Sequence, residues 1–282
     1  MKEKLNKEGV FMKNFINPDE LDQLDNVILI DVRQDLQDPT FGPKAYATEH
    51  LNNAFYLSLE EDLTGEITEN TGSHPLPSQD QIKKRLEEMG ANNESVFVFY
   101  DEGSNFTAPR GWFILKYFGL EKVFVLNGGF PAAVNYGYKM SQEVPKAQKS
   151  YIELSANQEL LASYDEIVKY SKKPNDEMVL IDSRSAERYR GEVEHLYDKA
   201  GHIPNAVNYF YGDNYTDEGI KKSDEELKER FSDLTKEQDI VVSCGSGVTA
   251  CANYIILDEV GFEPRLYNGS YSLWLKKGNT VD

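Results

Sequence analysis

Cysteine is scarce in this chain of 282 residues, which has only Cys244 and Cys251, seven positions apart. Two cysteines cannot build a disulfide framework, and these two lack the C-x-x-C spacing of zinc and redox motifs. The histidines His195 and His202 lie too far from them in the sequence to support a zinc site. We therefore expect no metal and a reducing, cytoplasmic environment.

An excess of positive charge is also missing, because the net charge is −18 and the isoelectric point is about 4.7. Proteins that bind a phosphate backbone need the opposite sign, so we expect no nucleic-acid partner. No apolar run approaches the roughly 18 residues of a membrane helix, and the N-terminus lacks the apolar stretch and cleavage site of a signal peptide. These absences predict a cytoplasmic protein with no membrane partner. An anionic substrate would need a local positive site within this acidic surface.

One sequence pattern occurs twice in the chain. The stretch VILIDVR at residues 27–33 returns as MVLIDSR at residues 178–184, and EHLNNA at 49–54 returns as GHIPNA at 201–206. A repeat of about 150 residues is too long for a solenoid. The repetition therefore indicates a duplicated domain.

Each copy alternates short apolar strands with helical segments. The runs VILI, VFVFY, VFVL, MVLI and DIVV are apolar throughout, which is typical of parallel strands buried on both faces. The segment SQDQIKKRLEEMG opens with a serine N-cap and closes at Gly90. This alternation predicts an α/β fold of two tandem domains, each a mostly parallel sheet flanked by helices.

A polar stretch without periodicity, SQEVPKAQKSYIELS, divides the two copies. We predict an N-terminal domain at residues 12–140, a linker at 141–157 and a C-terminal domain at 158–282. Met12 is also a candidate start of the chain, which would make the preceding residues a short lead-in.

The stretch DIVVSCGSGVTACANYIILDEVGF places Cys244 where a strand ends and a helix begins. Sites in parallel α/β sheets form beyond the carboxyl ends of strands. The glycines of the following loop permit unusual backbone angles, and the helix start near Val248 adds a positive end. Both features favour a thiolate nucleophile at Cys244, whereas Cys251 lies in an apolar stretch and is predicted to be core. The loop residues whose N–H groups can turn toward the sulfur and bind substrate are Gly245, Ser246, Gly247, Val248 and Thr249.

The duplication, the GHIP element and the loop CGSGVTA resemble the two-domain rhodaneses, which are the thiosulfate and 3-mercaptopyruvate sulfurtransferases. The resemblance covers residues 15–280. In that family the C-terminal domain carries the catalytic cysteine and the N-terminal copy is inactive. Here Asp101 stands at the corresponding N-terminal position, and a carboxylate cannot form a persulfide.

The resemblance implies a double-displacement reaction that needs no cofactor. Cys244 would take a sulfur from a small-molecule donor as a persulfide. The sulfur would then pass to a thiol acceptor, such as thioredoxin or a low-molecular-weight thiol, or to cyanide. We expect a monomer because the two halves can bury each other's faces.

The residues that follow the catalytic cysteine mark the sulfur donor in this family. Gly245 and Ser246 resemble the 3-mercaptopyruvate enzymes, whereas the thiosulfate enzymes usually carry Arg and Lys there. The resemblance implies that Ser246 acts with a histidine, matched by His74 in GSHPLPS, and with an acidic residue of the same domain as that histidine. The candidates for this acid are Glu60, Glu61 and Asp62.

The carboxylate of 3-mercaptopyruvate needs a cation, and the family places two arginines between its DSR and GHIP elements. Arg188 matches the first of these. The second lies in a Pro-Glu-Pro-Arg-like stretch, which here reads GEVEHLYDKAGHIP and contains no arginine. Arg190 is the candidate replacement.

Other functions fit parts of the same pattern. A thiosulfate sulfurtransferase and a non-catalytic rhodanese-like sulfur-binding or sensor module remain alternatives, and the half with Asp101 already has the character of such a module. Phosphatases of the same fold have a longer loop that closes with arginine as Cys-x5-Arg. The sixth residue after Cys244 is Ala250, so this chain lacks the cation that clamps phosphate.

Overall fold

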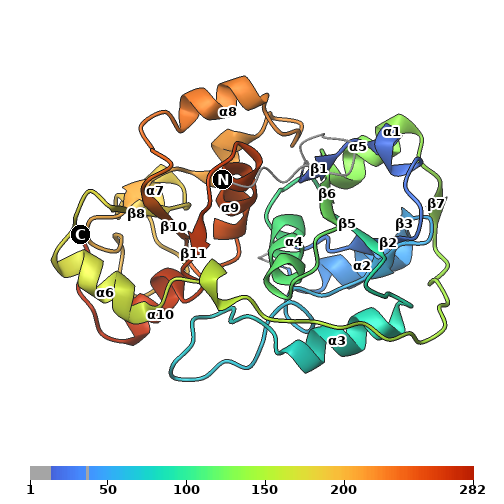
Figure 1. The fold of residues 1–282 in the computed structure, drawn as a ribbon, viewed down its shortest axis with the longest axis horizontal. Helices are drawn as coiled ribbons and strands as arrows, with labels where there is room; N and C mark the ends of the chain where they lie inside the picture. The colour runs from blue at the N-terminus through green and yellow to red at the C-terminus, as the bar shows by residue number, and fades with distance from the viewer. Residues whose placement is uncertain (1–13, 36–37) are drawn as a thin grey trace.

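The computed structural model describes residues 14–35 and 38–282, so residues 12 and 13, at the predicted start of the first domain, lie outside it. The described residues form two α/β halves that lie side by side, each on a parallel sheet (Figure 1). The predicted fold of two tandem α/β domains is confirmed. Within these ranges, no helix has the length and apolar character needed to cross a bilayer.

The N-terminal half is built on a parallel sheet with the strand order β1-β6-β5-β2-β4. Its strands are β1 (Phe15–Ile16), β2 (Val27–Asp31), β4 (Phe55–Tyr56), β5 (Val96–Tyr100) and β6 (Val123–Leu126), and a short antiparallel pair joins β3 (His50–Leu51) to β7 (Met140–Ser141). Its helices are α1 (Pro18–Leu21), α2 (Phe41–Thr48), α3 (Gln79–Glu88), α4 (Thr107–Tyr117) and α5 (Gly129–Tyr136). The predicted apolar strands are its central ones, buried on both faces.

The C-terminal half repeats this arrangement with the parallel strand order β11-β10-β8-β9. Its strands are β8 (Met178–Asp182), β9 (Val207–Asn208), β10 (Asp239–Ser243) and β11 (Arg265–Leu266). Its helices are α6 (Tyr164–Lys172), α7 (Ala186–Tyr189), α8 (Asp224–Arg230), α9 (Ala250–Glu259) and α10 (Ser270–Lys276), with single 3-10 turns η1 (Gln158–Leu160) and η2 (Tyr211–Asn214). A parallel bridge between Leu161 and Leu266 takes the place of β1, so the two sheets match strand for strand.

The segment between the halves begins after β7, which contains Ser141, the first residue of the predicted linker. Residues 142–157 form neither helix nor strand. Their backbone is bound to the N-terminal half, where Ser155 N donates to Phe118 O at 3.0 Å and Asn157 N donates to Tyr117 O at 2.8 Å. The linker is therefore attached along α4 rather than free between the halves.

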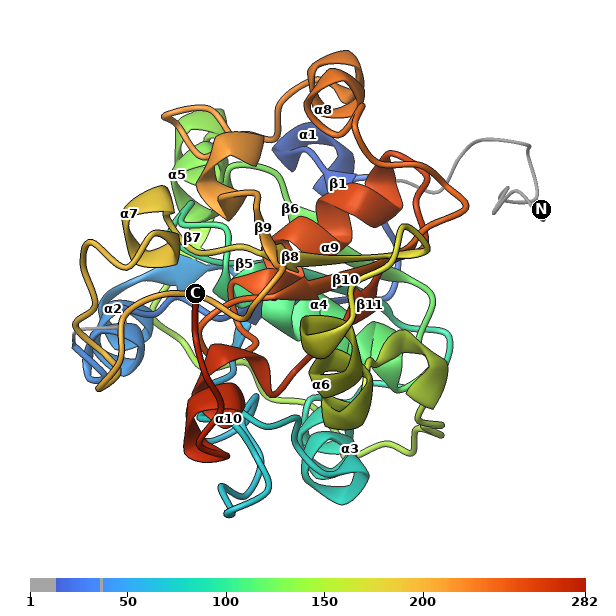
Figure 2. The same ribbon diagram turned by 90° about the vertical axis from the view of Figure 1, so that its left-hand side faces the viewer.

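The helices α4 and α9 lie between the two sheets (Figures 1 and 2). Both are mostly apolar, and nearly all residues of α4 and the first eight residues of α9 are buried. Phe113 on α4 contacts Tyr254 on α9 edge to face, with ring centroids 4.8 Å apart, and Trp112 lies 6.0 Å from the same ring. One apolar cluster consequently contains residues of both halves, so the interface is a continuous core.

Each half also sends a loop across the interface. From the N-terminal half, Ser73 N donates to Ser272 Oγ at 3.0 Å. In return, Lys221 N donates to Asn127 Oδ1 at 2.8 Å, and Asn105 donates to the carbonyl of Gly219 at 2.9 Å. The loop at the carboxyl edge of each sheet is thus covered by the opposite half.

The repeated Asp-x-Arg elements form buried ion pairs. Arg33 lies 2.8 Å from Asp31, and Arg184 lies 2.6 Å from Asp182. Each arginine also donates to the carbonyl just before its repeated histidine, at Glu49 and at Gly201 respectively. The same geometry in both halves indicates a structural role that fixes the end of β2 and of β8.

We expect Phe113→Ala to lower the free energy of unfolding by about 3–5 kcal/mol, because it opens a cavity in a fully buried aromatic contact. Urea denaturation would measure this, and fluorescence would report both halves because Trp112 and Trp274 lie in different ones. Val134→Ala, at a largely exposed position, serves as the control and should change stability by less than about 0.5 kcal/mol. A loss below 1 kcal/mol for Phe113→Ala would contradict a shared core.

Candidate functional site

Cys244 follows directly on β10, at the carboxyl edge of the C-terminal sheet, and is 2% exposed. The helix α9 begins at Ala250, slightly later than expected, after turns that bond Cys251 N to Val248 O and Ala252 N to Thr249 O. Residues 244–249 therefore form a short loop between strand and helix, as the sequence predicts.

The N-terminal N–H groups of α10 orient the peptide groups of this loop. Tyr271 N donates to Cys244 O at 3.0 Å and Ser272 N donates to Gly245 O at 2.8 Å. Because helix N-termini have unpaired N–H groups, α10 draws these two carbonyls outward. The loop's own N–H groups can then face inward, and Gly247 N donates to Cys244 Sγ at 3.1 Å.

Gly247 is the loop position at which a side chain is excluded. Its φ is +89°, a conformation that glycine adopts without strain. A Cβ atom there would lie 2.5 Å from the carbonyl oxygen of Asn268. Gly247 thus lets the backbone turn tightly enough to aim its N–H group at the sulfur.

Three further N–H groups of the loop, those of Ser246, Val248 and Thr249, meet no acceptor among the described residues. The N-terminal half shows what such groups bind, because its equivalent loop follows β5 and begins at Asp101. The equivalent N–H donors, Gly103, Asn105 and Phe106, bond the Asp101 carboxylate at 3.0, 3.2 and 3.1 Å. Burial raises the pKa of Asp101, and these hydrogen bonds oppose that shift. The duplicated loop is therefore a ring of donors for an acidic group.

Ser270 forms a hydrogen bond with the backbone of Cys244, a contact that was not predicted from the sequence. It has a φ of +50°, which is unusual for a residue with a side chain, and it is fully buried. Its hydroxyl donates to Tyr267 O at 2.9 Å and accepts from Cys244 N at 3.1 Å. The position follows the repeated Asn-Gly turn, where the N-terminal half has Gly129 at a φ of +57°.

Arg188 is the predicted cation that the structure brings to the loop. Its Nη2 lies 3.7 Å from the position a Cβ atom of Gly245 would take. It is bonded to Glu194, whose side chain is 2% exposed and lies 2.8 Å away. Arg190 is not brought there, since it is half exposed and pairs with Glu192 at 2.7 Å. Arg188 thus lies beside the cysteine loop and Arg190 points to solvent, because positions two apart on a helical turn face different ways.

Tyr197 is the residue of the segment GEVEHLYDKAGHIP that reaches the loop. Its hydroxyl lies 3.1 Å from the Cβ position of Gly245. Burial, and next the negative charge of the Cys244 sulfur, raises the pKa of Tyr197 to about 12. The hydroxyl is therefore protonated at neutral pH and stands where the sequence lacks the second arginine. The absence of that arginine was the only sequence signal for a substitute here.

His74 lies on the loop that crosses from the N-terminal half. Its carbonyl accepts from Asn268 at 3.2 Å, and its ring Nε2 lies 3.2 Å from Glu60 Oε1. Among the three acidic candidates, Glu60 is thus the one beside the ring. Burial lowers the pKa of His74, although Glu60 opposes the shift. No hydrogen bond joins His74 to Ser246 in the described part of the chain.

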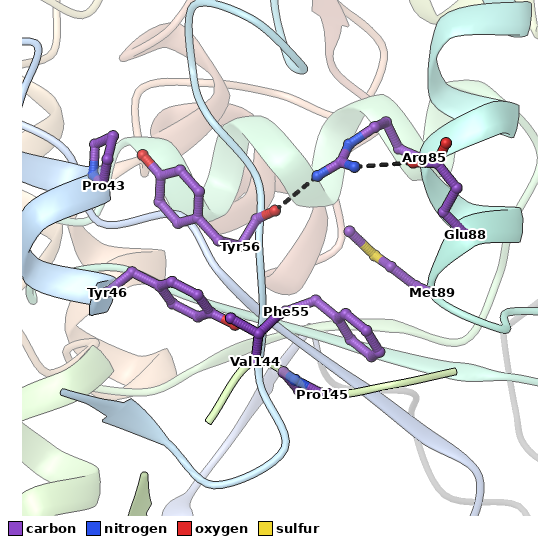
Figure 3. A pocket seen from close by; sticks show the side chains of 9 residues that line it. All are labelled: Pro43, Tyr46, Phe55, Tyr56, Arg85, Glu88, Met89, Val144 and Pro145. Carbon is purple, nitrogen blue, oxygen red and sulfur yellow. Dashed lines mark hydrogen bonds and ion pairs between the residues drawn. The ribbon is translucent and has the colours of Figure 1, made fainter. Parts of the chain in front are cut away.

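A cavity of about 340 Å³ lies elsewhere, at the outer edge of the N-terminal sheet (Figure 3). Tyr46, Tyr56 and Arg85 line it, and Arg85 is bonded to Glu88 and to the carbonyl of Tyr56. None of the predicted site residues faces this cavity. Over the described residues, no three His, Cys, Asp or Glu side chains are grouped to hold a metal ion.

Comparisons with known proteins identify the family and the fold of the chain. The model of the rhodanese-like domain matches residues 17–136 and 163–277. A Pseudomonas aeruginosa protein named "Probable 3-mercaptopyruvate sulfurtransferase" is 33% identical over 256 residues, 89% of each chain. Rat thiosulfate sulfurtransferase is 29% identical over 244 residues, 83% of this chain and 80% of its own. The crystal structure of SseA from Escherichia coli, a 3-mercaptopyruvate sulfurtransferase, has a TM-score of 0.80 at 27% identity and covers 93% of this chain and 100% of that one.

We expect iodoacetamide at pH 8 to label one thiol in the native chain, Cys244, and two after denaturation. Burial raises the pKa of Cys251 to about 12, and its sulfur bonds Gly247 O at 3.4 Å. Cys251 is then almost wholly in the unreactive thiol form at pH 8. Peptide mass spectrometry would locate the label, and labelling of Cys251 in the native chain would refute this assignment.

Proposed function

The chain belongs to the rhodanese-like family, and from this premise we propose that it transfers the sulfur of 3-mercaptopyruvate through a persulfide on Cys244 to a thiol or to cyanide. The Cys244 thiolate attacks the donor's sulfur, so an S–S bond forms as the C–S bond breaks. The electron pair leaves on carbon as the enolate of pyruvate, which takes up a proton. An acceptor thiolate then attacks the outer sulfur and releases the Cys244 thiolate.

The observation that carries the proposal is the contrast between Asp101 and Cys244 in the two copies of one loop. The carboxylate oxygens of Asp101 lie one bond beyond the position of a cysteine sulfur, and three loop N–H groups donate to them. A persulfide on Cys244 would extend its outer sulfur by the same one bond, toward the unpaired N–H groups of Ser246, Val248 and Thr249. Such donors stabilise a developing anion without a metal.

The surroundings of Gly245 favour 3-mercaptopyruvate over thiosulfate as the donor. Tyr197 and Arg188 both lie within 4 Å of the Cβ position of Gly245, so a long cationic side chain there would displace them. These neighbours favour the glycine that is present at position 245 over the cation usual in a thiosulfate enzyme. Arg188 bonds Glu194 through Nε and Nη2, and its Nη1 can instead meet one carboxylate of the substrate. The protonated Tyr197 hydroxyl can donate a second hydrogen bond to the same substrate.

Ser246 and His74 enter the proposal as the groups that polarise the substrate carbonyl. His74 reaches the C-terminal half on a loop fixed by Ser73 and Ser272, and Glu60 is proposed as its acidic partner. Gly247, Val248 and Thr249 act through their backbone. The chain is proposed to be a cytoplasmic monomer, supported by its scarce cysteines and by the core that the two halves share. The acceptor is proposed to be thioredoxin, a low-molecular-weight thiol or cyanide.

We expect Cys244→Ser to abolish sulfur transfer, because an oxygen nucleophile cannot form a persulfide. Cys251→Ser should keep most of the activity, because that thiol is buried and bonded to the backbone. The assay is thiocyanate production from cyanide, which a non-catalytic sulfur-binding module would not sustain over many turnovers. Full activity in Cys244→Ser would refute the mechanism.

We expect Arg188→Ala to lower kcat/KM for 3-mercaptopyruvate roughly 10- to 150-fold, or about 1.5–3 kcal/mol, through the loss of a charge-assisted contact. Arg190→Ala is the matched control and should change it less than about twofold, because its exposed ion pair contributes little. Both variants should also be assayed with thiosulfate. Equal losses would assign Arg190 to the site, and no loss in Arg188→Ala would favour thiosulfate as the donor.

A further inference from the structure

Arg110 is a fully buried arginine on α4 that reaches into the C-terminal half. Its Nη1 donates to Asn268 Oδ1 at 2.7 Å and to Gly247 O at 3.3 Å. Its Nη2 donates to three carbonyls of the N-terminal half, Leu63 O at 3.3 Å, His74 O at 3.0 Å and Pro75 O at 3.2 Å. One side chain thus joins the crossing loop to the loop that carries Cys244.

The guanidinium of Arg110 has no acidic partner in the described part of the chain. The other deeply buried arginines, Arg33 and Arg184, each bond an aspartate. Carbonyl and amide oxygens satisfy hydrogen bonds but do not cancel a full charge, which is costly to bury alone. Burial lowers the pKa of Arg110, and the sulfurs of Cys251 and Cys244 partly offset this. Arg110 is therefore a buried positive charge that no carboxylate of the described residues neutralises.

Of the two sulfurs that oppose the lowered pKa of Arg110, Cys251 has the larger effect and shares the Gly247 carbonyl at 3.4 Å, but burial raises its pKa to about 12. Cys251 is therefore neutral at neutral pH, which leaves Cys244 as the candidate counter-charge. Arg110 holds Gly247 by its carbonyl, and the N–H group of the same residue donates to Cys244 Sγ at 3.1 Å. The other titratable groups around the sulfur are Cys251, Tyr197 and Tyr211, and the pKa of each is raised to about 12, mainly by burial. They are neutral at neutral pH, and Arg188 is already bonded to Glu194.

The duplicated position argues against a purely structural origin. Arg110 lies nine residues after Asp101, and Asn253 lies nine residues after Cys244. Asn253 is equally buried, but it is neutral and bonds Asn214, Ser183 and Tyr209 within its own half. The same site on the duplicated helix therefore holds a cation only where it faces the cysteine loop.

We propose that Arg110 is a positioning residue of the catalytic loop: the buried counter-charge of the Cys244 thiolate and persulfide, supplied by the half that lacks a nucleophile. It holds the Gly247 carbonyl by a hydrogen bond. Its positive charge stays near the Cys244 sulfur both when the persulfide forms and when the sulfur passes to the acceptor. The persulfide part of this inference rests on the proposed function, whereas the thiolate part does not.

The test separates charge from hydrogen bonding with two variants of the whole chain. Arg110→Gln keeps donors and loses the charge, whereas Arg110→Lys keeps the charge and loses the planar fork. The readout is the rate of Cys244 alkylation by iodoacetamide against pH, followed by peptide mass spectrometry. Arg33→Gln is the control, because it removes a buried arginine far from the sulfur. Alkylation needs no sulfur donor, so the result stands even if the proposed function fails.

We expect Arg110→Gln to slow alkylation at pH 7 about tenfold and to move the pH profile up by about one unit, because a nearby cation favours the thiolate. Arg110→Lys and Arg33→Gln should keep the wild-type profile. An unchanged profile in Arg110→Gln, or equal shifts in the Gln and Lys variants, would overturn the proposal.

Loss of folding in Arg110→Gln would be met by placing citrulline at position 110 through nonsense-codon suppression. Citrulline has the shape of arginine and lacks its charge, and it keeps the N–H donors of two nitrogens while a carbonyl oxygen replaces the third. The same slowing is expected with citrulline, and a wild-type profile would overturn the proposal.

Discussion

The packing of α4 against α9 is the contact on which the site depends. Because Phe113 and Tyr254 close a core common to both sheets, the two carboxyl edges are held at a fixed relation. That relation lets Ser73 reach Ser272 and lets Arg110 reach Gly247. The cysteine loop is thus assembled from both halves, although every residue of the loop itself belongs to one.

The two copies of the loop differ in whether an acidic group accepts from the loop N–H donors at all times. Asp101 is covalently part of its loop, so its donors are satisfied at all times. Cys244 is one bond shorter, and the matching N–H groups of Ser246, Val248 and Thr249 meet no acceptor among the described residues. One side chain thus distinguishes the two copies, because the Asp101 carboxylate accepts from the loop donors and the Cys244 thiol does not reach the matching ones.

Most of the fold could be predicted from the sequence, because its signals are local. The strands β2, β5, β6, β8 and β10 are apolar runs, Ser78 caps α3 as expected, and the repeat predicted two matching sheets. The position of Cys244 at a strand end also followed from the pattern. The strand β7, which contains Ser141, had no signal of its own because it depends on pairing with β3, which is far away in the sequence; the linker bounds at 141–157 stay a prediction.

The surroundings of the loop could not be predicted in the same way. The ion pair of Arg188 with Glu194 and the approach of Tyr197 to Gly245 depend on how residues 190–201 fold over the edge of the sheet. Nothing in the spacing of these residues indicates it. Arg110 had a faint signal, a single charge within the apolar segment APRGWFIL, but its target lies in the other half of the chain.

The continuous core also constrains how a duplicated gene of this kind can evolve. A copy that loses its nucleophile would ordinarily be free to drift or to be deleted. Here deletion of the N-terminal half would expose the side of α9 that packs on α4, including Tyr254, which is now buried. The shared core therefore opposes the loss of either half, because removing one half would leave an exposed apolar patch on the other.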